Sequence, residues 1–219
     1  TDAAVANTPS AAWSGYREFV VQRRVVEDAG GTICSFYLAP ADGQPLPPYK
    51  PGQYLTFNLE VPDPAGSQPK ALVRCYSLSD RPHPEGYRIT IKRVPAPPGR
   101  ADLPPGASSN HFHDRVQEGT RLSVRAPSGH FHLIEEGDLP IVLIAGGIGI
   151  TPLLSILNTL AHRSDPRQVW LFYGVRNGSE PIMKEHLKAL RESHPSLHLH
   201  VCPCPRRSGR IRTSFPRST

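Results

Sequence analysis

Residues 141–157 restrict the possible folds of this chain more than any other stretch. Five apolar residues, Ile-Val-Leu-Ile-Ala, lead into three closely spaced glycines and then into apolar residues at helical spacing. A continuous apolar run is typical of a strand that is buried on both faces. Thr151 is a suitable helix N-cap, and Pro152 suits the first helical position because its missing N–H would be unpaired there. The stretch therefore predicts a strand, a glycine turn and a helix.

This turn predicts an anion site, because free backbone N–H groups lie at the positive end of a helix dipole. The dinucleotide fingerprint G-x-G-x-x-G can start at Gly147, but Pro152 then stands at its third glycine position. The next strand ends in Tyr-Gly-Val-Arg176, without the acid that holds a ribose hydroxyl. The alternative is that the glycines only let helix and strand approach closely.

The chain before this stretch has a different pattern, typical of short strands. Six segments rich in Val, Ile, Thr, Tyr and Phe are separated by loops of Gly, Pro and Asp: 16–26, 32–38, 53–59, 71–79, 87–94 and 121–126. They predict an antiparallel six-stranded β-barrel. From residue 141, strands at 141–145, 168–173 and 197–201 alternate with helices at 152–163 and 181–192. That alternation predicts a Rossmann-like α/β domain with a parallel sheet, which is incomplete because it stops at its third strand.

We therefore divide the chain into four parts. They are a flexible N-terminus (1–13), a β-barrel domain (14–137), a partial α/β domain (138–202) and a basic tail rich in Pro, Arg and Ser (203–219). The tail holds five of the 25 Lys and Arg residues and no acid, so the net charge of +6 belongs largely to it. Basicity confined to a tail does not indicate a nucleic-acid-binding face.

Cysteine and histidine usage indicates neither disulfides nor a metal site. Cysteines at 34, 75, 202 and 204 form no disulfide framework, which favours a reducing, cytoplasmic compartment. Three His-x-His pairs, at 111/113, 130/132 and 198/200, lack the supporting ligands of a metal centre, so we expect no bound metal. No apolar run reaches the length of a membrane span, and residues 1–12 do not resemble a signal peptide.

The strand at 71–79 carries a second candidate site. By strand alternation Arg74 and Tyr76 share one face, about 7 Å apart. A ligand with a planar ring joined to a phosphate would suit both side chains, although Arg and Tyr on one strand face are also an ordinary surface pattern. Residues 106–110, Gly-Ala-Ser-Ser-Asn, precede a helix-like stretch at 111–116 and add hydroxyl, amide and N–H groups. Lys92 adds positive charge, while Ser109 and Asn110 also suit a plain N-cap.

Five motifs, taken together and in this order, resemble the ferredoxin–NADP reductase superfamily. They are Gly52-Gln53-Tyr54, Arg74-Cys75-Tyr76-Ser77, Gly106-x-x-Ser109-Asn110, Pro127-Ser-Gly-His-Phe131 and Gly146-Gly-Ile-Gly-Ile-Thr-Pro152. The chain looks most similar to the reductase module of flavohaemoglobins and of oxygenase reductases, over residues 16–201. The resemblance implies an FAD-binding barrel followed by an NAD(P)-binding α/β domain.

The resemblance also implies roles for single residues. Arg74 would hold an FAD phosphate, Tyr76 would pack on the isoalloxazine, and Ser77 would hydrogen-bond near the flavin N5. Tyr76 and Ser77 are thus the expected catalytic residues. The expected cofactor-binding residues also include Cys75, Lys92, Gly106, Ser109 and Asn110 for FAD, and Gly146, Gly147, Ile148, Gly149, Ile150 and Thr151 for the nicotinamide nucleotide.

The implied activity is that of an FAD-dependent oxidoreductase. It would move electrons from NADH or NADPH through flavin to an iron-sulfur or haem protein or to a small oxidant. The choice of nucleotide stays open, although Arg176 is placed where it could read a 2′-phosphate.

The end of the chain leaves other functions open. Family members usually continue with more α/β structure, which does not follow Val201, so we expect a fragment or a diverged end. One alternative is therefore a flavin-binding remnant without turnover. A metal- or nucleic-acid-binding protein that uses the His-x-His pairs and the basic tail is the other.

Overall fold

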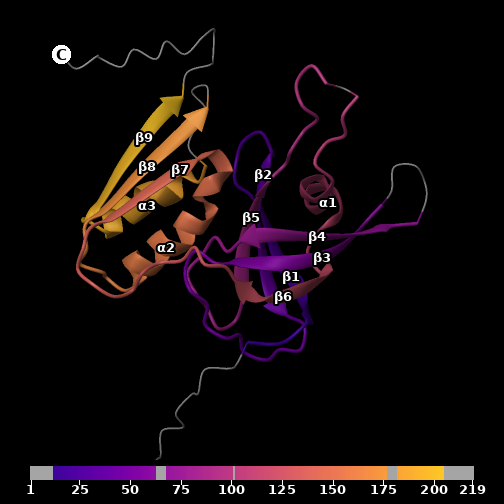
Figure 1. The fold of residues 1–219 in the computed structure, drawn as a ribbon, viewed down its shortest axis with the longest axis horizontal. Coiled ribbons are helices and arrows are strands. Elements are labelled where there is room, and N and C mark those ends of the chain that lie inside the picture. The colour runs from indigo at the N-terminus through magenta and orange to yellow at the C-terminus, as the bar shows by residue number, and fades with distance from the viewer. Residues whose placement is uncertain (1–11, 63–67, 101, 177–181, 205–219) are drawn as a thin grey trace, which may run out of the picture.

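The computed structural model describes residues 12–62, 68–100, 102–176 and 182–204. They form two units, an antiparallel sheet curved into a half-barrel and a parallel sheet with helices (Figure 1). The predicted segments at 1–13 and 203–219 lie mostly outside the described residues, as does the side chain of Arg176.

The first sheet confirms the predicted six-stranded antiparallel architecture. Its strands lie in the order β4-β3-β6-β1-β2-β5. They are β1 (Tyr16–Val26), β2 (Ile33–Pro40), β3 (Tyr54–Val61), β4 (Lys70–Ser77), β5 (Tyr87–Lys92) and β6 (Arg121–Ser128). The two edges approach each other at a bridge between Leu78, just after β4, and Ile89 in β5. The sheet is therefore a half-barrel whose edges meet locally.

The barrel core is aromatic. Helix α1 (Ala107–Arg115) packs into it through Phe112, whose ring lies 5.3 Å from Phe36 and 5.5 Å from Phe57, centroid to centroid. All three rings are fully buried. The helix begins four residues before the expected start at His111, because the N–H of Asn110 already donates to the carbonyl of Gly106 and closes a first turn.

Two glycines hold one end of the barrel together. Gly52 has φ +111°, and a Cβ there would lie 2.8 Å from the carbonyl oxygen of Phe131. Gly129 has φ +121°, and a Cβ there would lie 2.9 Å from the ring of Tyr54. Both positions thus require glycine for conformation and for space. At this end of the barrel, Tyr54 in β3 lies directly opposite Ser77 in β4.

The second sheet is parallel, as expected. Its strands β7 (Ile141–Gly146), β8 (Val169–Arg176) and β9 (Leu197–Cys204) lie in the order β7-β8-β9. Helices α2 (Thr151–His162) and α3 (Lys184–Ser193) both cover the same face (Figure 1). They share one core with the inward side chains of the sheet, among them Leu143, Leu171 and Tyr173.

The expectation that residues 141–145 are buried on both faces is wrong. Val142 is 60% and Ile144 78% exposed, whereas Leu143 and Ala145 are buried. Both crossovers run in the same direction along the sheet, so right-handed connections place both helices on one face. In the part of the chain that is described, the opposite face stays open to solvent over these positions.

The predicted N-cap role of Thr151 is also wrong. A 3₁₀ turn, η1 (Gly147–Ile150), runs directly into α2, and Thr151 is itself helical with φ −54° and ψ −49°. Its hydroxyl donates to the carbonyl of Ile148 at 3.1 Å. Gly147 has φ +51°, a conformation that favours glycine at the start of the turn. The first free N–H groups therefore lie in η1 and not in α2.

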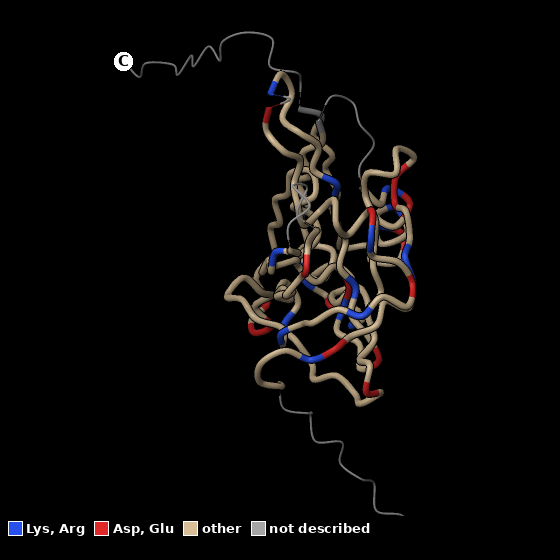
Figure 2. The backbone as a smooth tube through the Cα atoms, turned by 90° about the vertical axis from the view of Figure 1, so that its right-hand side faces the viewer, with Lys and Arg blue, Asp and Glu red and all other residues tan. Residues whose placement is uncertain are grey.

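Charges are mixed along the described chain. Figure 2 shows Lys and Arg positions interspersed with Asp and Glu positions over the barrel. Within the described residues, no helix has the length and apolar character needed to cross a membrane. In the same residues, no group of three His, Cys, Asp or Glu side chains is arranged to hold a metal ion.

Candidate functional site

A pocket of about 540 Å³ lies at the junction of the two units. We call it the junction pocket. Its volume lies within the range of about 300–1,000 Å³ that is usual for small-molecule sites. Of the predicted site residues, the pocket is lined by Arg74, Cys75, Tyr76, Ser77, Lys92, Gly106, Ser109, Ile148, Gly149 and Thr151. Residues of three separate sequence motifs are thus brought to one place.

Strand β4 forms one wall of the junction pocket. Tyr76 is half-buried, and its ring packs edge-on against Phe112 at 5.1 Å between centroids. Its hydroxyl shares a hydrogen bond with Ser108 at 2.7 Å. Burial raises the pKa of Tyr76, so the hydroxyl keeps its proton at neutral pH. Arg74 is exposed and donates to the carbonyl of Val73 at 2.7 Å.

The start of α1 presents backbone N–H groups to the pocket. The N–H groups of Ala107, Ser108 and Ser109 belong to the first turn, where no helical acceptor is available. These residues line the pocket together with the cations of Arg74 and Lys92. Free N–H groups at a helix start beside two cations suit a phosphate or pyrophosphate.

The side chains of Ser109 and Asn110 form hydrogen bonds with other residues of the chain. The Ser109 hydroxyl accepts from the N–H of Val94 at 3.2 Å and donates to the carbonyl of Gly106 at 3.2 Å. The Asn110 side-chain amide donates to the carbonyls of Val94 and Gly106, each at 2.8 Å, and accepts from Arg93 at 2.9 Å. Ser109 therefore reaches the pocket chiefly through its backbone, and Asn110 is absent from its lining.

The η1 turn forms the opposite wall. Ile148 and Gly149 line the pocket, followed by Thr151 and Pro152. A Cβ on Gly149 would have no atom within 4 Å, so the glycine leaves open space there. The remaining predicted residues of the turn are not part of this lining: Gly146, Gly147 and Ile150. Ile150 is fully buried in the α/β core.

A second pocket, of about 610 Å³, lies beside the first. Lys92 lines both pockets, and Gly147 lines the second. The Tyr173 hydroxyl donates to the Gly147 carbonyl at 3.1 Å and accepts from the N–H of Ile182 at 3.3 Å. This tyrosine fixes the glycine turn to the start of the α3 region.

Several lining residues were not predicted from sequence. They are Thr90, Ile91, Val94, Ala107, Ser108 and Pro152. Strand alternation could have found Thr90, which lies two residues before Lys92 and so shares its face. Ser108 had no such signal, because its exposure to the pocket depends on where α1 begins.

Three histidines of the His-x-His pairs, His113, His198 and His200, have structural partners. His113 is buried in α1, and its Nε2 lies 3.0 Å from the carbonyl oxygen of Ile91. His198 and His200 lie on β9 and stack on Trp170, at 4.2 and 5.6 Å between ring centroids.

Comparison with known proteins agrees with this geometry. The family described as Oxidoreductase FAD-binding domain matches residues 14–133, and Oxidoreductase NAD-binding domain matches residues 143–214. A flavohemoprotein of Halalkalibacterium halodurans is 42% identical over 94% of this chain and 51% of its own length. The chain thus spans about half of that protein.

Two solved structures are similar along most of the chain. The FAD/NAD-binding domain of nitric oxide dioxygenase from Vibrio cholerae superposes with a TM-score of 0.74 at 31% identity, covering 85% of this chain and 73% of that one. Phthalate dioxygenase reductase gives a TM-score of 0.64 at 28% identity, covering 92% of this chain and 55% of that one.

The residues at the junction fit the cofactors that these families bind. Two cations, free helix N–H groups and a fixed tyrosine ring suit FAD, and the open space at Gly149 suits close approach of a second nucleotide. The chain therefore belongs to the FAD-binding oxidoreductase domain family, with an NAD-binding oxidoreductase domain following in the same chain.

Proposed function

We propose that this chain is the reductase part of an FAD-dependent oxidoreductase that takes electrons from NADH or NADPH. The junction pocket carries the proposal, because residues 74–77 of the barrel line the same space as Ile148, Gly149 and Thr151 of the α/β domain. The proposed domain limits are 14–137 for FAD binding and 138–202 for NAD(P) binding. Two dinucleotides would meet between them.

The barrel residues would hold FAD. Arg74, Lys92 and the free N–H groups of α1 would bind its phosphates, and Tyr76 would present its ring to the flavin. The Ser77 hydroxyl would donate a hydrogen bond to the flavin edge. Bound FAD would supply the redox chemistry by accepting a hydride from the nicotinamide and passing the electrons on.

The α/β residues would hold the nicotinamide nucleotide. The N–H groups of η1 would bind its phosphates, and Gly149 would leave room for it beside the flavin. Hydride transfer needs oriented rings more than acid–base groups. These residues therefore act mainly by orientation and by excluding water.

We propose a haem or iron-sulfur protein, or a small oxidant, as the electron acceptor. Support comes from the flavohemoprotein relative, which is about twice as long as the matched chain. Phthalate dioxygenase reductase, the second structural relative, is described as a modular structure for electron transfer from pyridine nucleotides to a 2Fe-2S centre. The acceptor would approach the flavin at the junction pocket.

We also propose a cytoplasmic location. Cys34, Cys75 and Cys202 are free thiols, which is usual in a reducing compartment. Burial raises the pKa of the Cys34 thiol, so this cysteine stays protonated and unreactive at neutral pH. Fractionation of cells that express the chain would test the location, and recovery in an oxidising compartment would contradict it.

Anaerobic titration tests the proposed activity. The purified chain is reconstituted with FAD, and NADH or NADPH is added while flavin absorbance is recorded. Bleaching by either nucleotide supports the proposal, and the ratio of the two rates identifies the donor. A yellow protein that does not bleach is a flavin-binding domain without turnover. A chain that rejects FAD contradicts both.

A further inference from the structure

The two units are joined by few apolar contacts. Each has its own hydrophobic core, and the core of the α/β unit takes in Ile33 and Leu133 from the preceding part of the chain. Apolar packing is non-directional, so an apolar contact made by these two side chains does little to fix the angle between two domains. Directional polar contacts at the junction are better suited to that role.

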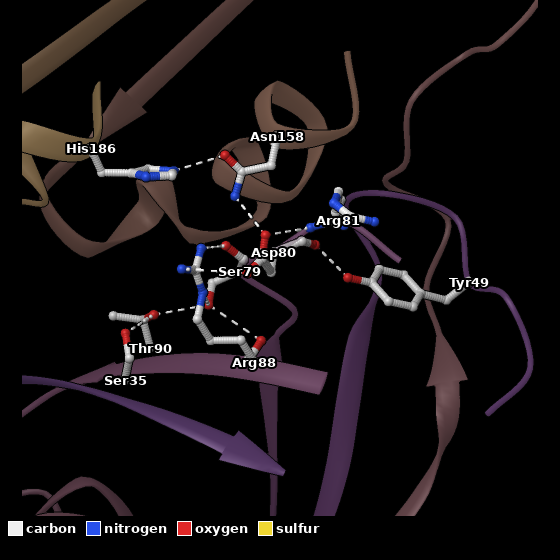
Figure 3. Close-up of polar contacts among 9 residues, drawn as sticks. All are labelled: Ser35, Tyr49, Ser79, Asp80, Arg81, Arg88, Thr90, Asn158 and His186. Atoms are coloured by element: carbon white, nitrogen blue, oxygen red, sulfur yellow. Dashed lines mark hydrogen bonds and ion pairs between the residues drawn. The ribbon is translucent and has the colours of Figure 1, made fainter. Parts of the chain in front are cut away.

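A chain of hydrogen bonds crosses the junction from Asp80 to His186 (Figure 3). The Nδ2 of Asn158, on α2, donates to the Oδ1 of Asp80 at 2.8 Å. The Nε2 of His186, on α3, lies 2.8 Å from the Oδ1 of Asn158. An ionised carboxylate only accepts hydrogen bonds, so the amide must turn its NH₂ group to Asp80 and its oxygen to His186.

The histidine completes this chain as a donor. Burial, with a further contribution from Arg88, lowers the pKa of His186, so the ring is neutral at pH 7. Its single N–H must then lie on Nε2, because the Asn158 oxygen can only accept. Asn158 is 7% exposed, so both of its hydrogen bonds are partly shielded from water.

The barrel holds Asp80 from several sides. Arg88, whose side chain is 6% exposed, pairs with the carboxylate at 3.5 Å and also donates to the carbonyl of Ser79. The N–H of Arg81 donates to Oδ1 of Asp80 at 2.8 Å, and the Tyr49 hydroxyl donates to the backbone carbonyl of Asp80. The acceptor for Asn158 is thus held in position by contacts within the barrel.

Asp80 and Asn158 each belong to a segment that also lines one wall of the junction pocket. Asp80 lies three residues after Ser77, which lines the pocket. Asn158 lies seven residues after Thr151, about 10 Å along the helix that leads away from the η1 wall. On the barrel side, the hydroxyl of Ser79 bonds that of Thr90, another lining residue, at 2.8 Å.

We infer that Asp80, Asn158 and His186 are positioning residues, which hold the η1 turn opposite β4 so that nicotinamide and flavin meet in reactive orientation. The inference rests on the proposed function. All three side chains lie outside the lining of the junction pocket. Their loss therefore leaves FAD binding intact and misplaces the second nucleotide, and a displacement of about 1 Å can slow a reaction about 100-fold.

The test exchanges charge across the central hydrogen bond. Asn158→Asp sets two carboxylates against each other, and Asp80→Asn combined with Asn158→Asp restores a donor and an acceptor. In the FAD-loaded chain, we expect Asn158→Asp to slow flavin reduction at saturating nucleotide about tenfold or more, and the double variant to recover most of the rate. FAD affinity should stay within about twofold in both.

Asp165→Asn is the matched control. Asp165 pairs with Arg167 at 2.7 Å and, like Asp80, is partly buried, but both partners belong to the α/β unit. This variant should keep the unmodified rate of flavin reduction. If Asn158→Asp does not retain FAD, Asn158→Ala takes its place, because it removes the hydrogen bonds without adding charge.

A calorimetric readout separates this inference from the proposed function. The FAD-loaded chain should unfold in one transition and Asn158→Asp in two, because the two units lose their coupling. A chain that NADH and NADPH both fail to reduce overturns the proposed function, while calorimetry still tests the junction. The inference is overturned if Asn158→Asp keeps the unmodified reduction rate or unfolds in a single transition. It is also overturned if Asp165→Asn slows flavin reduction as much as Asn158→Asp does.

Discussion

Replacing Arg74 with alanine should weaken FAD binding and leave the fold intact. The side chain is exposed on β4, and its guanidinium donates to the carbonyl of Val73 in the same strand. Exposed substitutions away from a buried network usually change stability by no more than about 0.5 kcal/mol. The apoprotein should therefore unfold at nearly the same denaturant concentration as the unmodified apoprotein.

The cost to FAD binding follows from the contact that is lost. A hydrogen bond to a charged group contributes about 1.5–3 kcal/mol, and about 1.4 kcal/mol corresponds to a tenfold change in Kd. We therefore expect the Kd for FAD to rise by about 10- to 150-fold. Arg74→Lys keeps the charge but loses the fork that grips two phosphate oxygens, so its Kd should fall between those of the other two proteins.

Fluorescence titration of apoprotein with FAD measures these constants, and urea unfolding of the same samples checks the fold. Arg121→Ala is the control, because Arg121 is also exposed and pairs with Glu18 in the same sheet, outside the junction pocket. An Arg74→Ala protein that binds FAD as tightly as the control would refute the phosphate role. If Arg74→Ala lowered the free energy of unfolding by as much as the free energy of FAD binding, the conclusion that Arg74 serves the site and not the fold would be refuted.

Three further outcomes can be measured. Phe112→Ala removes a fully buried ring that packs on Tyr76, so the free energy of unfolding in urea should fall by about 3–5 kcal/mol, and FAD affinity with it. Gly149→Val should fold normally, since a Cβ there meets no atom within 4 Å, and should keep its flavin while nucleotide-driven bleaching slows about tenfold or more. Burial lowers the pKa of His113 below its ordinary 6.5, so the folded state binds fewer protons than the unfolded state under acidic conditions. Its contribution to stability is therefore complete above pH 6.5 and is lost as the pH falls through the lower folded pKa, a decrease that His113→Gln should reduce in urea unfolding.

The strands of the barrel could be predicted because their signal is local. On β3, Leu55, Phe57 and Leu59 are buried, and the residues between them are not, which is the period of two that the sequence displays. The parallel sheet was predictable for the same reason, from the alternation of strand and helix patterns.

Burial on the two faces of β7 could not be read in this way. An apolar run shows that Val142 and Ile144 can be buried but not whether anything covers them. Coverage depends on which face the crossover helices take, which is a property of the sheet order. The conformation of the turn after β7 could not be predicted either. The glycines permit a 3₁₀ turn as readily as an extended segment that ends at Thr151.

The site was predictable where its residues are consecutive in sequence. Residues 74–77 line the junction pocket, and so do Ile148, Gly149 and Thr151. Their roles toward the cofactors stay predictions until the titrations are done. The Asp80–Asn158–His186 chain had no sequence signal, because a polar residue that meets a partner in another domain has the same local pattern as a solvated one.

Lys92 has a consequence for how the two pockets respond to each other. Its single positive charge borders both of them. An anion bound in one pocket partly neutralises that charge, so it reduces the attraction for an anion in the other. Thermodynamic linkage makes this penalty the same in both directions. Anion binding in the two pockets would therefore be antagonistic at this residue, and rising salt, which screens the lysine, would weaken the antagonism.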